Sequence, residues 1–163
     1  MLITMLSHPE EALNDVFPFL AGMELFSILL ALWVWSLGTF LNSVVPAPLR
    51  MSRTFFRVAV IFVPLYIPIF GVFFQRMGHV RDVRVTLISY ALIFPLHLFA
   101  LFCQLHSLYF VSKALALAER GCPSSLPDYI GYFVGLWILP VGVWIIQPRI
   151  NRLYAGILDR QTA

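Results

Sequence analysis

Charged residues are scarce in this chain: only 12% of its 163 residues are Asp, Glu, Lys or Arg, while 60% are hydrophobic. A typical soluble domain contains about 25% charged residues and about 45–50% apolar residues. The shortage of charge excludes an ordinary soluble protein, and the length allows four membrane spans of about 20 residues with short connections. We therefore expect a single integral membrane domain over residues 1–163, with the lipid bilayer as its surroundings.

Cysteine is nearly absent, and two other features are missing. The two cysteines, Cys103 in an apolar run and Cys122 in a polar loop, do not indicate a disulfide framework. No Lys or Arg precedes Glu10, so a cleavable signal peptide is not indicated and we expect the first apolar run to remain in the mature protein. There is no GxSxG sequence and no glycine-rich phosphate loop, so we expect no catalytic residues and no enzyme.

What the chain does contain is four long apolar runs, over residues 16–41, 55–75, 85–111 and 129–147. Backbone groups inside a membrane must be satisfied internally, so each run is predicted to be a helix. The connections between the runs are short, which favours antiparallel neighbours. The predicted fold is all-α, a bundle of four transmembrane helices.

Basic residues lie at the ends of these runs. Arg149 and Arg152 follow the last run, and Lys113 follows the third; we expect all three at lipid headgroups. Such placement accounts for the formal net charge of +3, so we expect no nucleic-acid partner. Residues 148–163 have apolar side chains at helical spacing, which indicates an amphipathic helix in the membrane interface; a disordered tail is the alternative.

A faint internal repeat relates the first and third runs. The stretch ELFSILLAL from Glu24 resembles HLFALFCQL from His97, which would give two tandem helical hairpins; a chance match between apolar helices is the alternative. If the repeat holds, Glu24 and His97 occupy equivalent positions and face each other. A hydrogen bond between them would lower the cost of a carboxyl group inside the membrane.

The third run has polar side chains on two opposite faces. His97 and Gln104 share one face, and Cys103 and His106 share the other. A helix with two polar faces is expected to lie in the centre of a bundle, with partners on each side. Cys103 and His106 are three residues apart and could supply two metal ligands, but no motif supplies the others, so we expect no metal and no cofactor.

Gly131 and Gly135 form a GxxxG sequence in the fourth run, which is typical of close helix packing within a bundle or between copies.

By general shape, four short-linked apolar helices with little else, the chain resembles small bacterial inner-membrane proteins, among them accessory subunits and immunity proteins. The resemblance implies a non-enzymatic subunit that binds another membrane protein or a second copy of itself. Two alternatives remain: an oligomeric channel or transporter with a polar path through Glu24 and His97, and a haem- or metal-binding redox subunit that uses His97 or His106. Counts of basic residues (Lys and Arg) on the two sides are nearly equal; we expect both termini in the cytoplasm.

Overall fold

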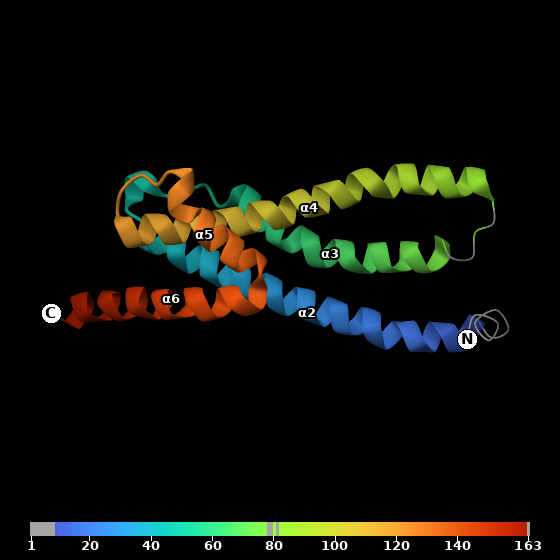
Figure 1. The fold of residues 1–163 in the computed structure, drawn as a ribbon, viewed down its shortest axis with the longest axis horizontal. Helices are drawn as coiled ribbons and strands as arrows, with labels where there is room; N and C mark the ends of the chain where they lie inside the picture. The colour runs from blue at the N-terminus through green and yellow to red at the C-terminus, as the bar shows by residue number, and fades with distance from the viewer. Residues whose placement is uncertain (1–8, 78–79, 81, 163) are drawn as a thin grey trace.

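The computed structural model describes residues 9–77, 80 and 82–162, and all regular structure in this part of the chain is helical (Figure 1). The elements are α2 (Pro9–Val44), the short 3-10 helix η1 (Ala47–Leu49), α3 (Thr54–Met77), α4 (Val83–Arg120), α5 (Leu126–Trp137) and α6 (Leu139–Thr162). The predicted all-α class is confirmed for these residues.

Three helices are long and apolar enough to cross a membrane, over Phe17–Val44, Thr54–Met77 and Val83–Arg120. They lie side by side and alternate in direction (Figure 1), as the short connections predicted. By length and composition they make the chain a multi-pass integral membrane protein, and they correspond to the first three predicted spans. Helices α2 and α4, with 36 and 38 residues, extend beyond those spans.

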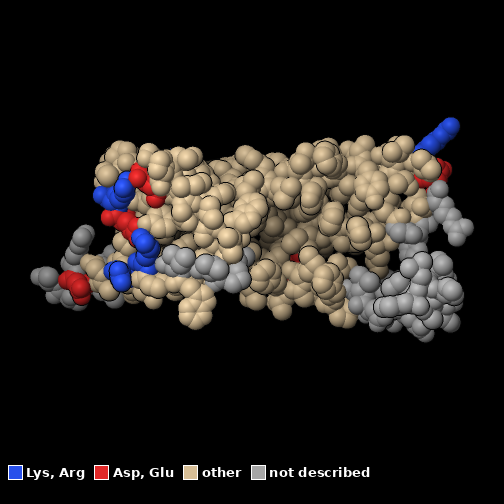
Figure 2. Space-filling model, in the orientation of Figure 1, with Lys and Arg blue, Asp and Glu red and all other residues tan. Residues whose placement is uncertain are grey.

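The outer surface of the three-helix section is apolar. Large hydrophobic side chains are exposed along the first half of α2, most of α3 and the first half of α4, as in Phe19, Leu65 and Leu92. Charged side chains instead gather at the two ends of the molecule, and the stretch between them is almost free of charge in the view of Figure 2. A surface of this kind is suited to lipid rather than to water.

The buried core lies toward the end of the bundle where α2 and α4 end, and it is formed by the second halves of these two helices with α5 and α6. Small side chains in α4, such as Ala114 and Ala116, are fully or almost fully buried and let the neighbouring helices approach closely. Phe56 of α3 stacks on Phe110 of α4, with ring centroids 4.2 Å apart. On its other side the Phe56 ring occupies the space that a Cβ atom on Gly38 of α2 would need.

The loop between α2 and α3 is fixed by one buried side chain. Asn42 is 1% exposed, and its amide donates to the Met51 carbonyl while its carbonyl accepts from the Met51 N–H, both at 3.0 Å. Arg50 adds hydrogen bonds to the carbonyls of Val45 and Ser43, each at 3.0 Å. The Arg50 bonds satisfy carbonyls at and just after the end of α2, which lack helical partners, whereas the Asn42 bonds hold the loop backbone at Met51.

The fourth predicted span differs from expectation, because residues 129–147 do not form one helix. Helix α5 ends at Trp137, Ile138 leaves helical geometry with φ −91° and ψ 70°, and α6 starts at Leu139. Pro140 has no N–H to continue the hydrogen-bond pattern of α5, but such a residue is well accommodated in the first turn of a new helix. Residues from 148 onward continue α6 without a break, as far as Thr162.

Two further expectations concern the same part of the chain. The tandem hairpins of the faint repeat are not reproduced, since α3 is one helix of 24 residues whereas its counterpart is divided between α5 and α6. Of the helix expected over residues 148–163, the described part, 148–162, is helical; residue 163 lies outside the described residues, and placement in the membrane interface remains a prediction.

We predict that Asn42→Ala lowers the free energy of unfolding by about 1–3 kcal/mol, because the partly buried Met51 N–H and carbonyl lose their partners. Denaturant titration of the protein in mild detergent measures the change. Ser43→Ala is the matched control, since the Ser43 side chain is exposed and bonds only within its own helix, to the Phe40 carbonyl. Equal stability of the two variants would show that the hydrogen bonds between Asn42 and Met51 do not stabilise the fold.

Candidate functional site

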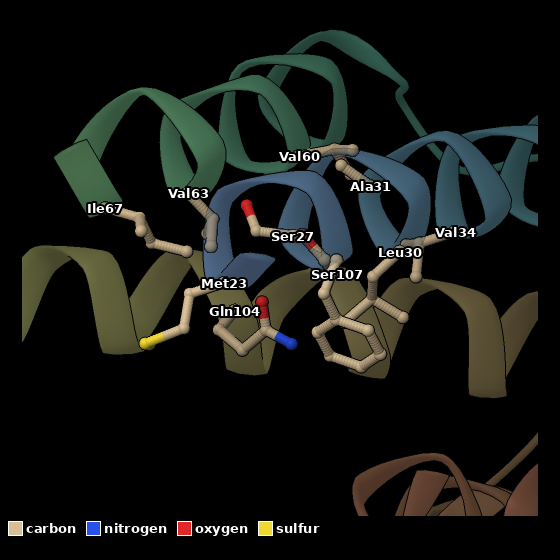
Figure 3. Close-up of a pocket in the computed structure, with 11 residues that line it drawn as sticks. Met23, Ser27, Leu30, Ala31, Val34, Val60, Val63, Ile67, Gln104 and Ser107 are labelled. Carbon is tan, nitrogen blue, oxygen red and sulfur yellow. The ribbon is translucent and has the colours of Figure 1, made fainter. Parts of the chain in front are cut away.

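A cavity of about 250 Å³ lies between α2, α3 and α4, near the middle of the bundle (Figure 3). Most of its wall is apolar, and three polar side chains interrupt it: Ser27 of α2 and Gln104 and Ser107 of α4. The apolar lining consists of Met23, Phe26, Leu30, Ala31, Val34, Val60, Val63 and Ile67. Apolar walls with a few convergent polar groups are the usual form of a small-molecule site.

The three polar side chains of the cavity differ in how they are satisfied. Ser107 donates to the Cys103 carbonyl at 2.8 Å, within its own helix. Ser27 is 6% exposed, and its hydroxyl oxygen has no hydrogen-bond partner among the described residues. Gln104 is half-buried and likewise makes no hydrogen bond to the described part of the chain. Ser27 and Gln104 therefore leave hydrogen-bonding capacity directed at the same apolar space.

Glu24 lies beside this cavity rather than in it. It lines a second hollow of about 260 Å³ between α2 and α3, together with Trp35, Pro64 and Leu65 among others. Ala31 and Val60 border both hollows, so the two lie on either side of one contact between α2 and α3. One carboxylate oxygen of Glu24 is buried and has no partner among the described residues.

The expected pair of Glu24 and His97 is not formed. The Nδ1 atom of His97 instead lies 2.8 Å from the hydroxyl of Tyr66, in hydrogen-bond contact, and the His97 ring packs on Phe70 with centroids 5.2 Å apart. Tyr66 and Phe70 both belong to α3. The polar partner of His97 therefore comes from α3 and not from α2. Glu24 also lies against α3, but beside Pro64 and Leu65.

The opposite face of α4 holds Cys103 and His106, which the sequence placed together. Cys103 is fully buried, and His106 meets the Phe55 ring edge-on with centroids 4.6 Å apart. The described residues contain no group of three or more His, Cys, Asp or Glu side chains that could hold a metal ion. The central position expected for this helix is observed, since α4 packs against α2, α3, α5 and α6.

A charged cluster joins α4, α5 and α6 at the end of the bundle where α4 stops. Tyr132 donates to Glu119 at 2.6 Å and accepts from Arg149 at 2.9 Å, while Arg149 and Glu119 form an ion pair at 3.6 Å. Arg152 lines a neighbouring hollow of about 500 Å³ with Glu119 and Arg149. Arg149, expected at lipid headgroups, is thus engaged within the protein.

Lys113 and the two glycines of the GxxxG sequence also have specific surroundings. Lys113 donates to the Tyr109 hydroxyl at 3.0 Å and lies over its ring. A Cβ atom on Gly131 would meet nothing within 4 Å, whereas one on Gly135 would lie 3.7 Å from Cα of Gly142. The glycine contact therefore joins Gly135 to Gly142 and does not involve Gly131.

Comparison with protein-family models, with curated proteins and with solved structures found no match for this chain.

Sequence reasoning identified Gln104 but missed Ser27, Ser107 and Tyr66. A signal for the serines was present, because Ser27 follows Glu24 by three residues and Ser107 follows Gln104 by three, which puts each pair on one helical face. Tyr66 lies between Pro64 and Pro68. Its position in an aromatic-rich run gave no sign that its hydroxyl would meet a histidine from another helix.

We predict that Tyr66→Phe lowers the free energy of unfolding by about 1–3 kcal/mol, because His97 loses its hydrogen-bond partner in an apolar environment. The control is Tyr90→Phe, since the Tyr90 side chain is exposed and makes no hydrogen bond to the described residues. Reversible unfolding in detergent compares the two. If Tyr66→Phe is as stable as Tyr90→Phe, the contact between Tyr66 and His97 does not stabilise the bundle.

Proposed function

We propose that this protein is a non-enzymatic membrane protein that binds a neutral, lipid-soluble molecule in the cavity between α2, α3 and α4. The observation that carries the proposal is the buried Ser27 hydroxyl, which has no partner among the described residues and faces the same apolar space as Gln104. A buried polar group without a partner costs about 1–3 kcal/mol. A bound hydroxyl or carbonyl group would offset that cost.

The size of the cavity favours a slender ligand. An apolar cavity of about 150 Å³ is enough to bind benzene. The cavity here, at about 250 Å³, suits a somewhat larger group, such as a stretch of hydrocarbon chain that ends in one polar function. Met23 and Phe26 line the cavity and are also exposed on the apolar surface, so a ligand can enter from the lipid.

The chemistry of the walls favours a neutral head group. Among the described residues no Asp, Glu, Lys or Arg lines the cavity, so a charged group moved there from water would find no ionic partner among them. The Ser27 hydroxyl can donate one hydrogen bond and accept others, and the Gln104 amide can likewise donate and accept. A terminal alcohol or carbonyl therefore fits this site better than a carboxylate, phosphate or amine.

The other functional hypotheses from the sequence stay predictions. These are recognition of another membrane protein or a second copy, a channel through Glu24 and His97, a haem- or metal-binding redox subunit, and residence in a bacterial inner membrane. The channel hypothesis loses its expected polar contact, because His97 is paired with Tyr66 and Glu24 lies on the other side of the α2 and α3 contact.

A photoreactive probe tests the proposed site. The protein in lipid vesicles is exposed to a dodecanol that carries a diazirine in its chain, and adducts are mapped by mass spectrometry. We expect adducts on the cavity walls near Met23 and Gln104 in excess over exposed sites such as Leu92. Unlabelled dodecanol should compete about tenfold better than dodecane, because one buried hydrogen bond is worth about 1.4 kcal/mol at the upper end of its usual range.

Two variants distinguish the cavity from general lipid contact. Ser27→Leu fills the space and removes the hydroxyl, so we expect the cavity adducts to disappear while those at Leu92 remain. Ser36→Ala is the matched control, because Ser36 lies on the same helix with an exposed side chain. Adducts spread evenly over the apolar surface, unchanged in Ser27→Leu, would refute the proposed function.

A further inference from the structure

Helices α5 and α6 form a hairpin whose arms are too short to cross a membrane. Helix α5 has 12 residues, and the apolar part of α6 covers nine residues, from Leu139 to Gln147. At about 1.5 Å per residue these arms are about 18 Å and about 14 Å long. The hydrocarbon core of a bilayer is about 30 Å thick. Each arm therefore matches about half of that thickness.

The direction of the arms agrees with their length. Helix α5 leads from the end of the bundle where α4 stops toward the middle of the long axis, and α6 returns to the same end (Figure 1). The base of the hairpin is charged: Arg120 pairs with Asp128, and Arg149 pairs with Glu119. Bonds from the Ser125 N–H and hydroxyl, and the pairing with Arg120, hold the pKa of Asp128 below its usual value, which keeps the carboxylate charged.

The turn of the hairpin is apolar and exposed. Trp137, Ile138 and Trp144 are 55%, 50% and 83% exposed. They continue the apolar surface of the three spanning helices without a charged residue between Asp128 and Arg149. An exposed surface of this composition, with charge only at its base, is complementary to the interior of a bilayer and not to water.

The backbone of the turn meets the demands of that environment. Only Ile138 departs from helical geometry, and its N–H donates to the Val134 carbonyl at 3.1 Å while its own carbonyl accepts from Gly142 at 2.9 Å. Leu136 and Ile146 bury the inner side of the hairpin in the core. Both backbone groups of Ile138 are thus bonded inside the protein, and non-helical backbone at membrane depth is tolerated where it is satisfied in this way.

We propose that α5 and α6 form a re-entrant hairpin, which enters one leaflet from the side where α4 ends and leaves on that same side. Its exposed turn contacts the acyl chains of that leaflet. The chain then crosses the membrane three times, so residues near Arg84 lie on one side, whereas Cys122 and the second half of α6 lie on the other. This arrangement differs from the expected four spans with both termini in the cytoplasm.

Cysteine labelling from each side of the membrane tests the topology. Three single-cysteine proteins are made in a background without native cysteines: one that keeps Cys122, one with Ala155→Cys and one with Arg84→Cys. A membrane-impermeant maleimide is added to vesicles of known orientation. We expect Cys122 and the Ala155→Cys position to react from the same side, and the Arg84→Cys position to react from the opposite side.

Two results would overturn the hairpin. Reaction of the Cys122 and Ala155→Cys positions from opposite sides would show that the segment crosses the membrane. Reaction at Ala155→Cys only after detergent is added would place that part of α6 inside the bilayer.

A glycine comparison tests the turn itself. A Cβ atom on Gly142 would fall on the Gly135 carbonyl, whereas one on Gly131 would meet nothing within 4 Å. We expect Gly142→Ala to lower the melting temperature in detergent by about 5 °C or more, because the added methyl group would clash with the Gly135 carbonyl. A backbone carbonyl cannot move aside as a flexible side chain can. Gly131→Ala should shift it by less than about 1 °C. Equal melting temperatures would show that the two arms do not cross at these glycines.

Discussion

The contact of Phe56 with Gly38 and Phe110 joins α2, α3 and α4 at one level, and the arrangement of the bundle depends on it. The ring lies where Gly38 has no side chain and stacks on Phe110 at an interplanar angle of 16°. On one side of this level the helices separate enough to leave the cavity and to expose apolar side chains. On the other side, small residues of α4 allow the close packing of the core. Packing against lipid supplies no hydrophobic drive, so a close fit of this kind is what holds such helices together.

Several hydroxyl groups in the bundle are satisfied by a carbonyl of their own helix. Ser107, Ser112 and Thr39 each donate to the carbonyl four residues earlier. A hydroxyl bonded in this way makes no demand on neighbouring helices. Ser27 does not make this bond, Gln104 makes no hydrogen bond to the described residues, and one buried carboxylate oxygen of Glu24 meets no donor among them. Ser124, in the loop before α5, is a further buried hydroxyl without a partner among the described residues, so Ser27 and Gln104 stand out because both border one cavity and not by their lack of partners alone.

The sequence predicted the three spanning helices because an apolar run of that length has few alternatives once lipid is the solvent. It did not predict the break at Ile138, because proline and glycine are also common within unbroken membrane helices, so Pro140 and Gly142 were ambiguous. It placed Gln104 on a polar face of α4 but paired His97 with the wrong helix. Helical spacing gives the angle of a side chain around its own axis, whereas the partner depends on how the helices are rotated against each other, which no single run encodes.

The hairpin and the cavity are linked through α4. Its second half forms the core with Leu136 of α5 and Ile146 of α6, and the start of the same buried stretch, at Ser107, is already part of the cavity wall. The close contact of Gly135 and Gly142 lets α5 and α6 lie near each other, and Leu136 and Ile146 are buried in the same core as the second half of α4. One helix, α4, therefore takes part in the core with its second half and, through Gln104 and Ser107, in the wall of the cavity.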